Sequence, residues 1–356
     1  MSIPPRRKYL IRTAAGFMLA CIILASLYPV LIESKDPESI LIHSVVNGSA
    51  AGFLIGLCIT IAELAWFQGQ GKKMRFLPYL LMQTFFYVVV INIWVVGVSI
   101  LHQVLIDGIR MDDVLASESI RDLMYGRAFL KVNAYALVMI FFVNFVRQVN
   151  RMLGQNALMN FLTGKYHKPV EEERVFMFLD LKASTPIAEK LGHKKYHEFL
   201  NDFFFDITPA IVESRGEIYQ YVGDEIVVTW SKRGDTVPAD SIYCYFRIAA
   251  AVARTSDRYE REYGFIPEFK AGFHYGPVVT GFIGDVKRDV VFHGDTVNTA
   301  SRIRTECTTV NKNLLLSGDL LRNITLSSSL TPERMGRIRL KGKEKEIELF
   351  TLAEAS

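Results

Sequence analysis

The chain has 356 residues, 50% of them hydrophobic, and a net charge of only +4. This length suffices for two domains, and the mild charge, without a basic tract, argues against a nucleic acid as partner. The four cysteines form no CxxC pair and no framework typical of secreted proteins, which indicates a reducing compartment for the polar half of the chain.

Four apolar segments dominate the first half of the chain, at about 10–32, 41–66, 77–106 and 128–147. Each is long enough to cross a bilayer, which takes about 20 residues. The first is not a cleavable signal, because charged residues and no small-residue cleavage pattern follow it. We therefore expect residues 1–147 to form an all-α transmembrane bundle of four helices.

The charges of the connecting segments predict the orientation of these helices. Lys and Arg residues precede the first span, separate the second from the third and follow the fourth. The two other loops, around 33–38 and 107–122, are net acidic. The positive-inside rule then places both termini in the cytoplasm.

Three ionisable residues fall near the ends of the expected spans. His43 and His102 lie at the outer ends and Glu63 at an inner end. One interpretation is that all three are hydrated in the headgroup layer. The other is a sensor site in which the two histidines face one another and bind a metal or haem, or titrate.

The segment 148–171 is expected to be a juxtamembrane linker helix. Its residues at alternating spacings of three and four are compatible with a short dimer seam with polar core positions, or with an unpaired helix. These residues are Val146, Val149, Leu153, Asn156 and Asn160.

The first chemical motif of the remaining domain, 172–356, is a pair of aspartates. The apolar run 174–181 predicts a buried strand that ends near Asp180. Farther on, two β-rich runs flank Gly223 and Asp224, which predicts a tight hairpin. A hairpin beside the strand brings Asp224 near Asp180. Two converging carboxylates suit Mg²⁺, which takes one or two carboxylates plus substrate phosphates.

Further elements follow in chain order. Periodicity predicts helices over 193–213 and about 239–263, and a bent strand pair over 269–283. His274 in that pair is expected to be structural. The sequence 337–352 predicts a terminal hairpin that turns at Gly342, beside Lys341.

The second chemical motif is GDTVNTASRIR, at 294–304. Asp295 or Thr296 can cap a helix there. Asn298 and Arg302 then lie four residues apart on one face. An amide beside a guanidinium suits a transition state that accumulates negative charge on oxygen. Without the upstream aspartates, a surface helix with a polar face would be the simpler interpretation.

Four sequences in this order, FLDLKAST, YVGDE, HGDTVNTASR and LKGK, resemble the catalytic domain of class III adenylate/guanylate cyclases. The resemblance covers about residues 172–353, and the whole chain resembles bacterial cyclases with a multispan membrane anchor. It implies an α/β (α+β) ferredoxin-like fold, a head-to-tail homodimer, and a multi-pass protein of the bacterial inner membrane.

The resemblance also implies the roles of individual residues. Asp180, Leu181 and Asp224 would hold two Mg²⁺ or Mn²⁺ ions per active site. Asn298 and Arg302 would act from the partner subunit on the ribose and on the transferring phosphorus. The triphosphate would be bound by residues after the first strand and by a terminal lysine: Lys182, Ala183, Ser184, Thr185 and Lys341.

The positions that usually read the base depart from the family pattern. They hold Gln220 and Val291 in place of a lysine and an aspartate or threonine. A glutamine amide can donate and accept, so it suits adenine but can also turn to read guanine. The expected reaction is attack of the ribose 3′-oxygen of ATP on the α-phosphorus, giving cyclic AMP and diphosphate, as the output of a signalling receptor.

Alternatives from other classes remain at this point. A guanylate cyclase has the same machinery with GTP as substrate. A diguanylate cyclase shares the VGDE hairpin but lacks the later Asn-x-x-x-Arg helix. A non-catalytic sensor that only binds a nucleotide is a third alternative. A transport role for the membrane half is disfavoured, because the spans show no inverted repeats broken by Gly or Pro.

Overall fold

The computed structural model describes residues 5–32, 38–67, 76–153, 160, 163–232, 234–286, 288–339 and 346–354. The chain divides into two compact units, Met1–Val149 and Asn150–Ser356.

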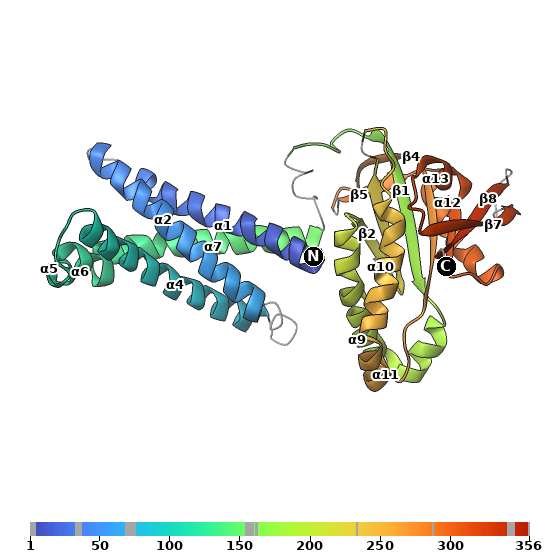
Figure 1. Cartoon of the computed structure of the whole chain (residues 1–356), viewed down its shortest axis with the longest axis horizontal. Coiled ribbons are helices and arrows are strands. Elements are labelled where there is room, and N and C mark those ends of the chain that lie inside the picture. Colours follow the sequence, from blue (N-terminus) through green and yellow to red (C-terminus); the bar gives the residue numbers. More distant parts are fainter. Residues whose placement is uncertain are drawn as a thin grey trace. The chain divides into compact units, whose positions relative to one another are not determined.

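The first unit is built from long helices, as expected. They are α1 (Pro5–Ile32), α2 (Glu38–Ala62), α4 (Phe76–Leu105) and α7 (Arg127–Leu153), which run side by side in Figure 1. Among the described residues, three segments are long and apolar enough to cross a membrane: 43–62, 77–105 and 127–146. The apolar segment found in α1, Met18–Val30, is shorter. The structure thus supports the second, third and fourth predicted spans, while the first, at 10–32, rests on the sequence alone.

The acidic loop between the third and fourth expected spans contains structure that the sequence did not predict. It forms two short helices, α5 (Met111–Ala116) and α6 (Glu118–Tyr125). Ser117 caps α6 by accepting a hydrogen bond from the Ile120 amide, the usual role of a serine at this position. Val114 and Ile120 are fully buried, so this loop packs against the bundle.

Polar side chains link the helices of this unit. Asn92 on α4 and Asn133 on α7 exchange two hydrogen bonds of 2.9 and 3.1 Å, an interhelical role typical of membrane asparagines. The rings of His43 and His102 lie 5.5 Å apart at their centroids, in a T-shaped arrangement with 73° between the ring planes. Glu63 lies on η1 (Glu63–Phe67), a π-helical turn that continues α2, and accepts hydrogen bonds from the side chains of Gln83 and Tyr87. It is therefore tied to α4.

The linker is helical only in part. Helix α7 continues to Leu153, but 163–168 form turns and bends and the first strand begins at Val170. The helix expected over 148–171 therefore does not extend to its predicted end. Asn156 of the possible dimer seam lies outside the described residues, as do the side chains of Val149 and Leu153.

The second unit is built on one mixed sheet in the order β2-β3-β1-β4-β6-β8-β7, with β5 paired to β4. Its first part, β1-α9-β2-β3-α10-β4, is the ferredoxin-like βαββαβ arrangement that the resemblance implied. The strands are β1 (Val170–Leu181), β2 (Glu217–Val222), β3 (Glu225–Ser231), β4 (Phe269–Ile283), β5 (Asp289–His293), β6 (Leu314–Ser317), β7 (Leu330–Ile338) and β8 (Ile347–Glu354). The helices are α9 (Ser184–Glu213), α10 (Asp240–Arg254), α11 (Ser256–Tyr263), α12 (Asp295–Thr309) and α13 (Gly318–Asn323).

Alternating side chains of β1 bury both faces of the sheet, which explains its continuous apolar run. Val175, Met177 and Leu179 pack into the main core with α9 and α10. Phe176 and Phe178 point the other way, into a smaller cluster with Ala300 of α12. Figure 1 shows α9 and α10 on one side of β1 and α12 on the other.

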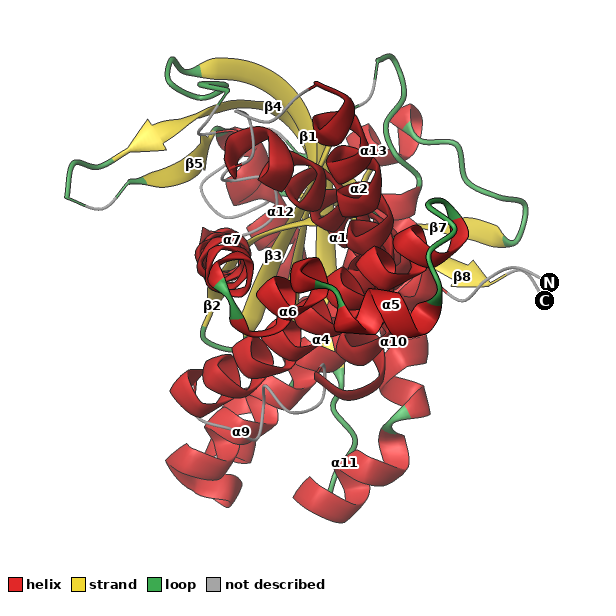
Figure 2. Cartoon of the chain, turned by 90° about the vertical axis from the view of Figure 1, so that its left-hand side faces the viewer, coloured by secondary structure: helices red, strands yellow, loops and turns green. Residues whose placement is uncertain are grey.

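Two expectations for this unit were wrong. The helix predicted over 239–263 is two helices, because α10 ends at Arg254 and α11 begins at Ser256, with Thr255 between them. The segment 269–283 is one 15-residue strand rather than a bent pair. Its Gly272 packs closely against α12 and makes no turn. Figure 2 shows β4 and β5 extending together beyond the rest of the sheet.

Candidate active site

The two predicted aspartates meet at one edge of the sheet. Strand β1 pairs with β3 so that Asp180 lies opposite Glu225, the residue after Asp224. Gly223 adopts φ 64°, which the tight β2–β3 turn requires and glycine allows. The carboxyl groups of Asp180 and Asp224 are close enough to share a hydrogen bond. The tight hairpin and the resulting approach of Asp224 to Asp180 agree with the sequence prediction.

Two cations approach this carboxylate cluster from the same chain. Arg304 of α12 lies 3.2 Å from Asp180 and 2.5 Å from Glu225, measured between guanidinium nitrogens and carboxylate oxygens. The Lys270 amine of β4 lies 3.4 Å from Asp180. Burial raises the pKa of the Asp180 carboxyl; Arg304 and Lys270 lower it, and Asp224 raises it. Burial likewise raises the pKa of Glu225, against the influence of Arg304.

Glycine at position 272 allows α12 to bring Arg304 to the site. A Cβ atom at Gly272 would lie 2.1 Å from the Arg304 amide nitrogen and 2.8 Å from the Ala300 carbonyl oxygen. Both are backbone atoms, so no side-chain rotation relieves the clash. The helix therefore packs directly against β4, next to the β1 strand that carries Asp180.

Asn298 and Arg302 lie on α12 but not on the face that carries Arg304. The helix begins at Asp295 as predicted, although Gly294 is the N-cap and the Thr296 hydroxyl donates to the Pro277 carbonyl instead of capping. Arg302 and Arg304 are two residues apart, hence about 200° apart around the helix. Asn298 is exposed and Arg302 half-buried. The pair thus does not join the carboxylates of its own chain.

The segment after β1 turns sharply into a helix. Ala183 adopts φ 53°, in the left-handed region, and α9 begins at Ser184. The first amides of a helix favour bound phosphate. The Lys182 amine pairs with the Glu268 carboxylate at 3.1 Å. Thr185 is exposed in the first turn, and Lys341 lies outside the described residues.

The two positions expected to read the base lie near each other. The rings of Tyr219 on β2 and Phe292 on β5 are in contact, with centroids 4.9 Å apart. Gln220 follows Tyr219 and Val291 precedes Phe292 in the chain, so the ring contact brings the two strand segments together. Gln220 is exposed and free to meet a ligand, while Val291 is half-buried.

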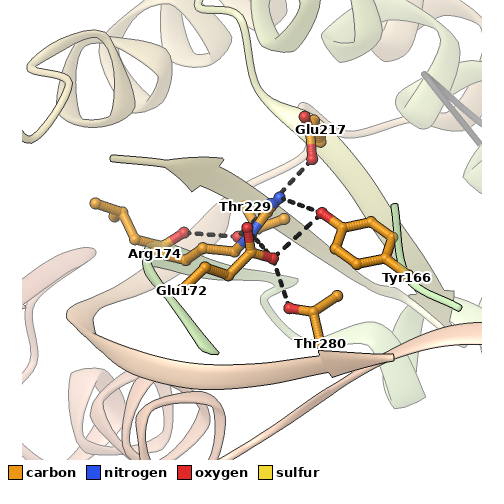
Figure 3. Close-up of polar contacts among 7 residues, drawn as sticks. Tyr166, Glu172, Arg174, Glu217, Thr229 and Thr280 are labelled. Atoms are coloured by element: carbon orange, nitrogen blue, oxygen red, sulfur yellow. Dashed lines mark hydrogen bonds and ion pairs between the residues drawn. The ribbon is translucent and has the colours of Figure 1, made fainter. Parts of the chain in front are cut away.

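A polar network around the buried Arg174 contacts the Tyr219–Phe292 ring pair through Phe292. Figure 3 shows the polar contacts of this network. Arg174 of β1, 1% exposed, donates to Glu172 and Glu217 at 2.9 Å each. Its guanidinium also stacks over the ring of Phe292, with 4.6 Å to the centroid. Burial alone would raise the pKa of Glu172, but a hydrogen bond from Thr280 and the charge of Arg174 lower it overall.

Three residues of the site were not predicted: Glu225, Lys270 and Arg304. A signal existed for two of them. Glu225 is a charged residue that opens an otherwise apolar strand. Arg304 lies four residues after Ala300, so it continues the buried stripe of α12 with a charge. Which carboxylates Arg304 meets depends on strand register and helix packing, which spacing does not reveal.

The carboxylates fit divalent metal ions. Mg²⁺ and Mn²⁺ prefer oxygen ligands, and Mg²⁺ sites usually combine one or two carboxylates with substrate phosphates. Asp180 and Asp224 supply such a pair. Burial, and after it the neighbouring Asp224, raises the pKa of Asp180, so an ionised carboxylate at this position gains from a nearby positive charge. A divalent cation would supply that charge.

The sequence model of the adenylate and guanylate cyclase catalytic domain matches residues 166–354. Adenylate cyclase 2 of Rhizobium meliloti (strain 1021) is 35% identical over 227 residues, 64% of this chain and 62% of the relative. An adenylate cyclase of Anabaena cylindrica is 27% identical over 184 residues, 49% of this chain and 35% of the relative. The chain thus spans less than two thirds of either relative. A solved bacterial light-regulated adenylyl cyclase shares the fold, with a TM-score of 0.54 at 18% identity over 64% of this chain and 67% of that chain.

Proposed function

The chain belongs to the family of adenylate and guanylate cyclase catalytic domains, and we propose that it is an adenylate cyclase that converts ATP to 3′,5′-cyclic AMP and diphosphate. The observation that carries this proposal is the convergence of Asp180 and Asp224 at one edge of the sheet. The relatives named adenylate cyclase support ATP as the substrate.

The residues of this chain have distinct tasks in the proposed reaction. Asp180 and Asp224 would hold two divalent ions, which would supply neutralisation of the triphosphate charge and a lower pKa of the attacking 3′-hydroxyl. The turn from Lys182 to Thr185 and the first amides of α9 bind the phosphates. Asn298 orients the ribose, and the Arg302 guanidinium stabilises the charge that develops on the phosphoryl oxygens.

The proposed active site is shared between two subunits. Arg304 fills the space between α12 and the carboxylates of its own chain, and Arg302 points to another side of the helix. A two-fold, head-to-tail homodimer lets Asn298 and Arg302 of one subunit face Asp180 and Asp224 of the other. Each dimer then has two equivalent sites.

In this proposal, Gln220 is the residue that selects the base of the nucleotide. Its exposed amide can pair with the edge of adenine, while Val291 offers only packing. One missing polar contact costs on the order of 1–3 kcal/mol, so selection of ATP over GTP is expected to be modest. The apolar helices of the first unit are proposed to anchor the enzyme in a bacterial inner membrane, by four spans with both termini in the cytoplasm, as a receptor for a signal.

Product identification tests this function directly. The purified full-length chain in detergent receives ATP or GTP with Mg²⁺ or Mn²⁺, and mass spectrometry identifies the products. Cyclic AMP as the main product, absent with the Asp180→Asn variant, is the expected result. A cyclic dinucleotide, or no cyclic product from either nucleotide, would contradict the proposal. Cyclic GMP as the main product would overturn ATP as substrate but leave the cyclase reaction intact.

A further inference from the structure

The helical unit contains a partly open cavity that the cyclase reaction does not use. It has a volume of about 420 Å³ and is lined by α1, α2, α4, α6 and α7. Protein interiors rarely contain voids larger than a water molecule. A volume of several hundred Å³ is instead the size of small-molecule pockets.

The cavity is polar at one end and apolar at the other. Ser44 and Asn47 line it near the start of α2, Ser99 lines it near the end of α4, and the same end lies under α6. Ile59 of α2 lies 15 residues beyond Ser44, about 22 Å along the helix, where the lining is apolar. The cavity is therefore elongated, with a polar head region and an apolar tail region.

The polar lining groups lack protein partners. Within the described part of the chain, the side chains of Ser44, Asn47 and Ser99 form no hydrogen bond. By contrast, Ser26 and Ser49 in the contact between α1 and α2 bond one another at 2.9 Å. Ser44, Asn47 and Ser99 are half-buried and line the cavity, so their hydrogen-bonding groups are available to a molecule bound there. The three unpaired groups therefore point to a ligand with a polar end.

The charge of the lining indicates which polar end fits. Among the described residues that line the cavity, Asp122 is the only charged one, and none is Lys, Arg or His. Its carboxylate already accepts hydrogen bonds from the amides of Arg127 and Ala128 at the start of α7. A carboxylate or phosphate head would meet no cation there and would be desolvated at a cost. A neutral head that donates and accepts hydrogen bonds has no such penalty.

We propose that this cavity binds a neutral amphiphile, such as a long-chain alcohol or ketone. Its hydroxyl or carbonyl group bonds to Ser44, Asn47 and Ser99, and its chain extends toward Ile59 and Ile140. The proposal concerns a ligand site of the helical unit and does not depend on the cyclase activity.

Photolabelling of the full-length chain in phosphatidylcholine nanodiscs tests this site. The probe is 1-dodecanol with a diazirine near the end of its chain, and peptide mass spectrometry locates the adducts. We expect saturable adducts on lining residues such as Ile59 and Ile140, which excess 1-dodecanol prevents. Adducts confined to outward-facing residues such as Phe85 and Phe141, without competition, would show ordinary lipid contact and overturn the proposal.

Two variants make the test specific. Ala136→Phe fills the cavity and should abolish the protected adducts, whereas Val138→Phe, at a position 60% exposed on the same helix, should leave them unchanged. Asn47→Leu keeps the side-chain volume and removes one polar partner of the ligand. Competition by 1-dodecanol should then weaken about tenfold, which corresponds to the free energy of one hydrogen bond. Dodecane or dodecanoate competing as well as 1-dodecanol would refute recognition of a neutral polar end.

Discussion

The buried guanidinium of Arg174 offers a quantitative test of what holds the catalytic unit together. The change is Arg174→Met, which keeps a long apolar stem and removes the charge. Arg174 is 1% exposed and donates to two carboxylates at 2.9 Å, so its loss leaves Glu172 and Glu217 without their cation. Removing one partner of a buried ion pair costs about 3–5 kcal/mol. For a unit of this size that is a fall of roughly 6–20 °C in Tm.

Trp230 provides the assay. It is 2% exposed on β3 and pairs with Val175, the neighbour of Arg174, so its fluorescence reports unfolding of this unit. Replacing the other tryptophans, Trp66 and Trp94, by phenylalanine removes the background from the helical unit. Thermal scans of Arg174→Met in this chain are then compared with the parent.

The control is Arg322→Met, because Arg322 is 62% exposed and pairs with Asp319 at the surface. Such pairs contribute at most about 1 kcal/mol. Adding Glu172→Gln to Arg174→Met removes one of the stranded carboxylates, so it should recover part of the lost stability. Equal Tm values for the Arg174 and Arg322 variants, or simple additivity in the double variant, would refute the reasoning.

Three further predictions follow from the site and its support. Gly272→Ala places a Cβ atom 2.1 Å from a backbone nitrogen of α12, so we expect a loss of at least about 2 kcal/mol of stability and of most cyclase activity, measured by thermal unfolding and product formation; unchanged values would show that α12 moves freely. Because the pKa of Glu172 is lowered in the folded state, its stabilisation is present above its unfolded pKa and is lost as pH falls through the folded pKa. Glu172→Gln should therefore flatten the stability profile below about pH 4.5 in urea titrations, and an unaltered profile would contradict this. Arg304→Met removes the cation beside Asp180 and Glu225, so the rise in Tm on adding Mn²⁺ should exceed that of the parent by the equivalent of about 1–3 kcal/mol; an equal rise would show that Arg304 does not compete with metal.

Local patterns predicted the parts of the fold that local chemistry determines. The apolar run of β1, the Gly223-Asp224 turn and helix α12 were located to within a few residues, because each depends on neighbouring positions in the sequence. Strand β4 was misinterpreted as a bent pair, because its continuous pairing with β1 and the contact of Gly272 with α12 depend on distant parts of the chain. Helices α5 and α6 were missed because the loop is short and polar.

In the candidate site, too, local features were predicted from the sequence and long-range contacts were not. The sequence identified the two aspartates and the Asn298–Arg302 pair, whose spacing is local. It did not reveal that Arg304 and Lys270 approach Asp180, because those contacts require the pairing of β1 with β4 and the packing of α12. The placement of Asn298 and Arg302 opposite the carboxylates needs a second copy of the chain, so it remains a proposal.

Mixing two inactive variants measures whether the active site is shared between subunits. Asp180→Ala damages the carboxylate half and Arg302→Ala the opposite half, so a mixed dimer keeps one intact site. Half of randomly formed dimers are mixed, and the mixture should regain about a quarter of the parent cyclase activity. A mixture of Asp180→Ala with Asp224→Ala, both in the carboxylate half, should regain none. Activity of the first mixture no higher than that of its separate components would contradict the account.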